Sequence, residues 1–173
     1  MKSLLALLVA LAAWPAFAEV IEGRVIEVPD GSTVTVLANE GASLHRVRLA
    51  GIEAPGRERS QGNASRESLR RLAVGKSVRV ETSAIDAKGL LVGIVLILRS
   101  ARDCRDQPCP ALVDPGLAQL KSGLAVIDKA YLSRHDAEAP QRYIGAEAQA
   151  RTSRLGVWRK PGVPVRVEVM QTR

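Results

Sequence analysis

Five short segments with the residue alternation of β-strands, interrupted once by a helix, constrain the fold of this chain more than any other feature. The first two are joined by Asp30-Gly31, a dipeptide that favours a tight hairpin turn. Between the third and fourth strands, a helix is expected to start at the capping residue Asn63 and to run to about Val74. The expected strands are residues 20–28, 32–38, 44–52, 77–82 and 90–98.

Two more helices are expected in the C-terminal third of the chain. Asp114-Pro115 reads as the cap and first residue of one helix, and Gly123 as its end. The other covers residues 140–154, with an apolar side formed by Ile144, Ala148 and Leu155. Five strands with a helix between the third and fourth fit an α+β fold, namely a five-stranded OB-fold β-barrel with about three helices.

Alternation within the third strand separates a buried side from an exposed side. Val47 and Leu49 fall on one face and are expected in the core, whereas Arg48 points to the opposite face. The fifth strand is apolar throughout, which indicates a central position in the sheet. Gly23, inside the first strand, is expected to mark a bulge or bend.

The N-terminus has the three parts of a secretory signal peptide. Lys2 precedes an apolar run at residues 4–13, which is too short to span a bilayer, and Ala16-Phe17-Ala18 is a small-residue cleavage site. We therefore expect residues 1–18 to be removed, residues 19–160 to form one domain and residues 161–173 to form a tail. Export to the bacterial periplasm or the medium is expected, with no transmembrane segment left after cleavage.

Charge and cysteine content agree with an exported protein that meets a polyanion. Residues 19–173 hold 24 basic and 18 acidic residues, a net charge of +6. This balance suits nucleic acid or a lipid surface, although it serves solubility equally well. Cys104 and Cys109 are expected to form a small-loop disulfide in an oxidising compartment, with two free thiols as the other reading.

Several motifs occur in a fixed order along about residues 20–160. They are DGSTVTV, VRLAGIEAP, VGKSVRVE, D-x-x-G before an apolar strand, LKSGLA and AEAQARTSRLGVW. Together they resemble the staphylococcal nuclease (thermonuclease) family, and this resemblance implies the same OB barrel. Family members cleave DNA and RNA with calcium: carboxylates hold the hard cation, two arginines neutralise the phosphate, and a carboxylate orients the attacking water.

The resemblance also shows which catalytic residues this chain keeps. Arg48 matches the first phosphate arginine, and Glu53 stands in place of a metal-binding Asp. Ser32 replaces the other metal-binding Asp, Gly56 replaces the water-orienting Glu, and Leu90 replaces the second arginine. Arg48 and Glu53 are thus the remnants of the catalytic set, and Glu53 alone remains as a metal ligand.

Two alternatives to this loss follow from neighbouring residues. Glu58 lies two positions after Gly56, and Lys88 lies two positions before Leu90, so each is a displaced substitute. Catalysis is sensitive to shifts of about 1 Å, which argues against such substitution. Arg48 is read either as a surviving phosphate contact or as the ion-pair partner of Glu53.

The candidate nucleic-acid-binding residues combine phosphate and pocket contacts. Arg70 and Arg71 belong to a basic loop, helix and strand, which is read as a phosphate-tracking surface or as a merely solvated face. Lys88 falls near a pocket tyrosine of the family, and only Tyr131 keeps a pocket position. The full set is Arg48, Arg70, Arg71, Lys88 and Tyr131.

The sequence therefore supports three functions. The first is an exported, catalytically inactive nuclease-like domain that binds nucleic acid or a protein partner in the cell envelope, without a cofactor. The second is an active calcium-dependent nuclease with a rearranged site. The third is a structural envelope protein with no ligand.

Overall fold

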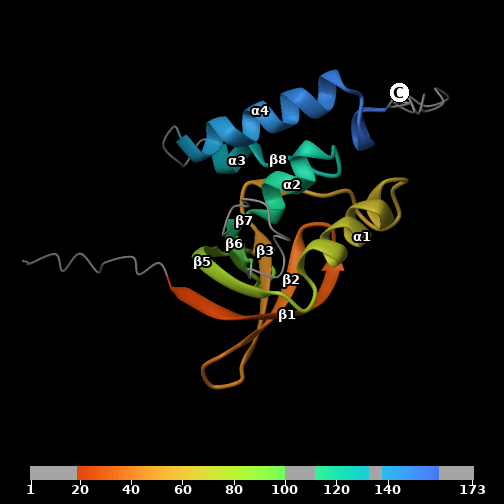
Figure 1. Ribbon diagram of the computed structural model, residues 1–173. Helices are drawn as coiled ribbons and strands as arrows, with labels where there is room; N and C mark the ends of the chain where they lie inside the picture. The colour runs from red at the N-terminus through yellow and green to blue at the C-terminus, as the bar shows by residue number, and fades with distance from the viewer. Residues whose placement is uncertain (1–18, 100–111, 133–137, 160–173) are drawn as a thin grey trace, which may run out of the picture.

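The computed structural model describes residues 19–99, 112–132 and 138–159. A closed barrel of five strands is its main element (Figure 1). Four of the strand pairs are antiparallel, and the parallel pairing of β3 with β6 closes the ring, with Val47 opposite Leu91. The barrel strands are β1 (Val20–Asp30), β2 (Thr33–Ala38), β3 (Leu44–Leu49), β5 (Ser77–Ile85) and β6 (Leu91–Leu98).

The predicted five-stranded OB barrel is thus confirmed, including the helix between the third and fourth barrel strands. β6 pairs with strands on both of its edges, as its apolar sequence predicts. Val47 and Leu49 are buried inside the barrel, whereas Arg48 between them is only half-buried. Alternation along the third strand was therefore read in the correct phase.

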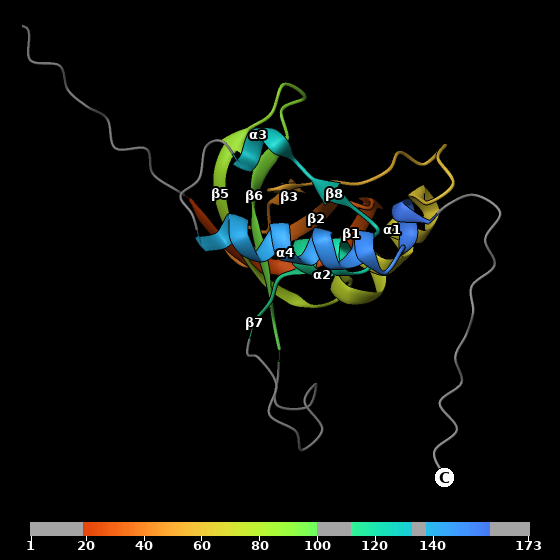
Figure 2. The same cartoon turned by 90° about the horizontal axis from the view of Figure 1, so that it is seen from above.

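Short elements and helices complete the fold. Figures 1 and 2 show α2 and α4 lying across one end of the barrel, with α1 along its side. Asp114 caps α2 as predicted, because its carboxylate accepts a hydrogen bond from the Leu117 backbone at 3.0 Å. These elements are α1 (Gly62–Ala73), α2 (Pro115–Lys121), α3 (Lys129–Leu132), α4 (Glu138–Thr152), β4 (Ile52–Glu53), β7 (Leu112–Val113), β8 (Val126–Ile127) and the 3-10 helix η2 (Gly156–Trp158).

Two local expectations about β1 and α1 are wrong. The register runs without a break through Gly23, and the irregularities lie beyond Val25. Gly23 is instead needed for close packing, because a Cβ there would lie 2.3 Å from the Leu37 carbonyl oxygen. The helix α1 starts at Gly62, one residue after its cap Gln61, so Asn63 lies inside the helix and does not cap it.

The expected apolar side of α4 is also wrong. Ile144 and Leu155 are about two-fifths exposed, at 40% and 39%. The helix packs instead through Tyr143, Ala146 and Ala150, which are buried. Small side chains allow this close approach, and the Tyr143 hydroxyl donates a hydrogen bond to Asp114 at 2.9 Å.

Several expectations concern residues outside the described ranges. They include the signal peptide at 1–18, the disulfide between Cys104 and Cys109, and the tail at 161–173. Among the described residues, no helix combines the length and the apolar character that crossing a bilayer requires.

Candidate functional site

The β1–β2 turn consists of Asp30-Gly31-Ser32. In the nuclease family that the sequence resembles, a metal-binding Asp occupies the position of Ser32. The Asp30 carboxylate accepts a hydrogen bond from the Ser32 backbone N–H at 2.9 Å. The Ser32 hydroxyl lies 3.3 Å from the same oxygen. Asp30 therefore acts as a turn residue here, as such an Asp-Gly sequence favours, and Ser32 adds only a neutral hydroxyl.

Gln119 holds this turn against the helices. It is fully buried in α2, and its amide nitrogen donates to the carbonyl oxygens of Gly31 at 3.0 Å and Ser65 at 2.9 Å. No sequence pattern indicates this role, because an isolated Gln in a helix is most often exposed. A tertiary contact thus fixes the geometry of the turn.

Arg48 forms an ion pair with Asp86, at 3.4 Å between Nε and the carboxylate. Pairing with Glu53, one of the two readings of Arg48, is therefore wrong. The Arg48 side chain extends from β3 toward the β5–β6 turn, which carries Asp86. The Asp86 carboxylate also accepts hydrogen bonds from the backbone N–H groups of Leu90 and Lys88. Leu90, at the position of the second phosphate arginine, contributes its backbone to this turn and no charge.

The bonds to Asp86 favour its ionised form. The Leu90 N–H bond lowers the pKa of Asp86 below 3.8 most strongly, and the Lys88 N–H bond and the Arg48 charge add to this against the opposing effect of burial. A depressed pKa in the folded state contributes stability above the unfolded value and loses it as the pH falls through the folded pKa.

Asp86→Asn is therefore expected to lower the free energy of unfolding at about pH 7, because the uncharged amide loses the Arg48 pair. The difference from the natural protein should shrink as the pH falls from 3.8, the ordinary pKa, through the lower pKa of folded Asp86, because Asp86 itself then becomes protonated. Urea unfolding midpoints at about pH 7 and about pH 2.5 measure this. Glu40→Gln, in an exposed turn, is the control; a difference for Asp86→Asn that stayed constant with pH would contradict the assignment.

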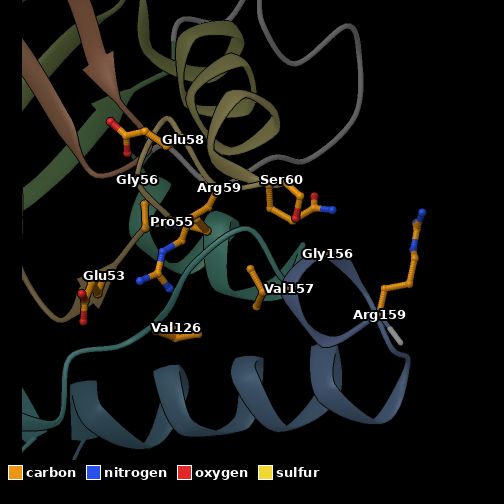
Figure 3. A pocket seen from close by; sticks show the side chains of 12 residues that line it. Glu53, Pro55, Gly56, Glu58, Arg59, Ser60, Val126, Gly156, Val157 and Arg159 are labelled. Carbon is orange, nitrogen blue, oxygen red and sulfur yellow. The ribbon is translucent and has the colours of Figure 1, made fainter. Parts of the chain in front are cut away.

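The remaining acidic residues do not converge on one point. Glu53 is exposed on β4 and lines a hollow of about 920 Å³, here called the Glu53 hollow, whose far wall includes η2. Glu58 lies on the rim of the same hollow. Figure 3 shows the two carboxylates well separated, one above and one below Pro55. Within the described ranges, no group of three or more His, Cys, Asp or Glu side chains could hold a metal ion.

These residues do not fit the calcium site that the resemblance implies. Calcium takes six to eight oxygen ligands, and carboxylates carry most of the charge compensation. Here Asp30 is engaged by its own turn, Ser32 is neutral, and Glu53 faces a different hollow. The Glu53 metal assignment therefore stays a prediction that this geometry does not favour.

The Glu58 carboxylate lies close to Gly56, the position at which the family carries its water-orienting Glu. A Cβ added to Gly56 would lie 3.2 Å from the Glu58 carboxylate. Glu58 also lines a hollow of about 400 Å³ together with Asp30, Ser32 and Gly56, here called the turn hollow. The loop thus returns one acidic group to the side of the barrel that carries the turn.

Arg48 shares a hollow with Tyr131. This space of about 230 Å³, here called the Tyr131 hollow, is also lined by Asp86 and Asp128. The Tyr131 ring stacks on Tyr143, with centroids 6.2 Å apart. Burial, followed by the nearby Asp114 charge, raises the pKa of Tyr131, so its hydroxyl is neutral. A cation and an aromatic ring therefore line the same hollow.

The other candidate binding residues lie elsewhere. Lys88 is exposed in the β5–β6 turn and does not line the Tyr131 hollow. Arg70 and Arg71 lie at the end of α1, where Arg70 is ion-paired with Glu67 at 3.0 Å. The structure thus brings together Arg48 and Tyr131 of the predicted set, and it separates them from Arg70, Arg71 and Lys88.

The closed five-stranded barrel, with a helix between its third and fourth strands, defines the class of this protein as an OB fold. The family described as Staphylococcal nuclease homologue matches residues 46–160, and the chain belongs to this family. It is 32% identical to a Micrococcal nuclease of Shigella flexneri, over 93% of this chain and 90% of that protein. Identity to Protein ParB of Escherichia coli is 29%, over 93% and 85% of the two chains. An Uncharacterized endonuclease of Escherichia coli O157:H7 is 33% identical over 55% of this chain and 61% of that one.

Proposed function

We propose that this chain is an exported member of the nuclease family that binds nucleic acid without cleaving it. One observation carries the proposal: Arg48 and Tyr131 line one hollow, whereas no group of three or more possible metal ligands comes together among the described residues. Binding needs a phosphate contact and a stacking surface, and cleavage needs a cation and a positioned water in addition. The first pair is retained in one place. The groups that hold the cation and orient the water are not, because Ser32 replaces a metal-binding Asp and Gly56 replaces the water-orienting Glu.

Charge and family both favour nucleic acid as the ligand. The positive balance of residues 19–173 suits a polyanion. The nuclease relatives favour nucleic acid as the ligand and give no support to a protein partner. The Arg48 side chain, although paired with Asp86, is 36% exposed, which leaves it accessible to a phosphate.

Export by the signal peptide completes the proposal. The three-part pattern of the N-terminus predicts that residues 1–18 are cleaved off during export, which would place the domain in the periplasm or the medium. N-terminal sequencing of the protein secreted by its natural host tests this directly. A mature chain beginning at Glu19 is expected, and retention of Met1 would contradict export by cleavage.

The function is tested with purified residues 19–173 and a labelled single-stranded DNA. We expect binding by fluorescence anisotropy and no cleavage, with calcium or with chelator. Arg48→Ala should weaken binding by about 1–2 kcal/mol, because a charge-assisted contact to phosphate is lost. Arg79→Ala is the matched control, since Arg79 lies on the barrel surface and is paired with Glu22 and Glu81. Equal weakening by both variants would contradict a specific contact at Arg48.

The position of Glu58 favours a second candidate function, a nuclease with a displaced carboxylate. It rests on the 3.2 Å approach of Glu58 to the missing side chain of Gly56. The same DNA assay decides between the two functions. Calcium-dependent cleavage that Glu58→Gln abolishes would establish the nuclease and overturn the first proposal. Absence of cleavage by a demonstrably folded protein would eliminate the second.

A further inference from the structure

Arginines from two distant segments line a hollow that the nuclease resemblance does not involve. This hollow of about 200 Å³, here called the basic hollow, is lined by Arg71, Leu72, Lys76, Ile97, Arg99 and Val113. Among the residues that the structure describes, its lining contains three basic residues and no acidic one. It shares no lining residue with the Tyr131 hollow or the turn hollow.

The barrel register explains why these residues meet. Val78, at the start of β5, lies opposite Ile97, near the end of β6, so Arg99 emerges beside the beginning of β5. The link from α1 to β5 is fixed by hydrogen bonds from Gly75 to the Val25 carbonyl at 2.8 Å and from Lys76 to the Ala73 carbonyl at 3.0 Å. This link places the last turn of α1, with Arg71, on the same side.

The charges of Arg71 and Arg99 are less compensated than those of two other arginines, Arg70 and Arg79. Arg70 is paired with Glu67, and Arg79 with Glu22 and Glu81. Over the described residues, no carboxylate forms an ion pair with Arg71 or Arg99. The helix dipole favours a cation at the end of α1, which explains Arg71. The helix dipole does not explain Arg99, which directly follows β6 and whose charge repels that of Arg71.

We propose that Arg71 and Arg99 bind a backbone phosphate of nucleic acid in the basic hollow, as a contact separate from the Tyr131 hollow. The proposal rests on the proposed function, because it concerns the same ligand. A phosphate carries oxygens that two guanidinium groups can bind together, and this offsets their mutual repulsion. Leu72, Ile97 and Val113 also line the hollow, and apolar residues of this kind suit the hydrocarbon stems of arginines whose charged ends stay in water; Arg71 and Arg99 are both exposed.

The test compares two double variants with identical loss of charge. Arg71→Gln with Arg99→Gln removes the basic hollow, and Arg70→Gln with Arg79→Gln removes two arginines that are already paired. Binding of a labelled single-stranded DNA is measured with chelator at about 50 to 200 mM salt. The first variant should bind about tenfold more weakly, and its log–log salt slope should fall by about 0.7, since each neutralised phosphate of a single strand contributes about 0.7 and the two arginines share one phosphate.

The outcomes separate this inference from the proposed function. Equal loss of affinity in the two double variants, or no loss in the first, would overturn the basic hollow while DNA binding itself stands. If neither the natural protein nor the Arg48→Ala variant binds DNA, the proposed function is overturned. Loss of binding to anionic phospholipid vesicles alone, with DNA binding retained by the first variant, would assign the hollow to a membrane surface and overturn nucleic acid as its ligand.

Discussion

Ser32→Asp combined with Gly56→Glu is expected to give this protein a calcium-dependent thermal stability that the natural sequence lacks. Both positions line the turn hollow, where Asp30 and Glu58 already lie. The two substitutions would place four carboxylates around one space of about 400 Å³, a donor set that suits calcium. The Gly56 backbone accepts a side chain once the flexible Glu58 carboxylate, 3.2 Å from the new Cβ, shifts slightly.

The size of the effect follows from ligand linkage. Calcium at about 100 times its dissociation constant stabilises the folded state by about 2.7 kcal/mol, which raises the melting temperature of a domain of this size by about 5–10 °C. Without calcium, the acidic variant should melt below the natural protein because the carboxylates repel one another. Differential scanning calorimetry with calcium and with chelator measures both changes.

Ser32→Asn combined with Gly56→Gln is the matched control. Its side chains have the same shape and no charge, so calcium should leave its melting temperature unchanged. An equal calcium shift in the natural protein would contradict the loss of the metal site. DNA cleavage by the acidic variant is a separate question, because Leu90 still lacks the charge of the second phosphate arginine.

Gln119→Leu is expected to destabilise the fold by about 2–5 kcal/mol. The change leaves the buried carbonyl oxygens of Gly31 and Ser65 without their donor, at a cost of about 1–3 kcal/mol each. Part of this is recovered, because the Gln119 side-chain oxygen has no partner in the described structure and disappears with the amide. Urea unfolding at 25 °C, with a shared slope, gives the difference.

Gln149→Leu is the control for this prediction. Gln149 is exposed on α4, so the same chemical change there should alter stability by no more than about 0.5 kcal/mol. A similar small effect at Gln119 would show that the β1–β2 turn keeps its position without the amide. The hydrogen bonds to Gly31 and Ser65 would then be a consequence of packing and not its cause.

Sequence patterns predicted the barrel well because they are local. Alternation in β3 reports which side of the strand is buried, and Asp30-Gly31 specifies a turn whatever lies around it. The α4 face was missed because Ala146 and Ala150 are small, and close helix packing values small side chains that a hydrophobicity pattern ranks below Ile144 and Leu155. The start of α1 was missed because Gly62 is selected by its contact with the preceding loop.

The candidate site divides in the same way. Motif order identified Ser32, Gly56 and Leu90 as losses, since the identity of a residue is enough to show that a carboxylate or a guanidinium is missing. It could not give the partner of Arg48, because Asp86 lies in a turn between two later strands. Nor could it separate Arg70 from Arg71, which differ only in the direction that each takes from α1.

The sequence by itself determined the five-stranded barrel, the family and the positions where catalytic groups are absent. These depend on periodicity, turn chemistry and side-chain identity, all of which act within a few residues. Only the tertiary structure decided that Arg48 forms an ion pair with Asp86. It also placed the carboxylates of Glu53 and Glu58 apart, and it brought Arg71 and Arg99 to one hollow. Those contacts join residues far apart in the chain, and the parallel pairing of β3 with β6 that closes the barrel sets where such residues meet.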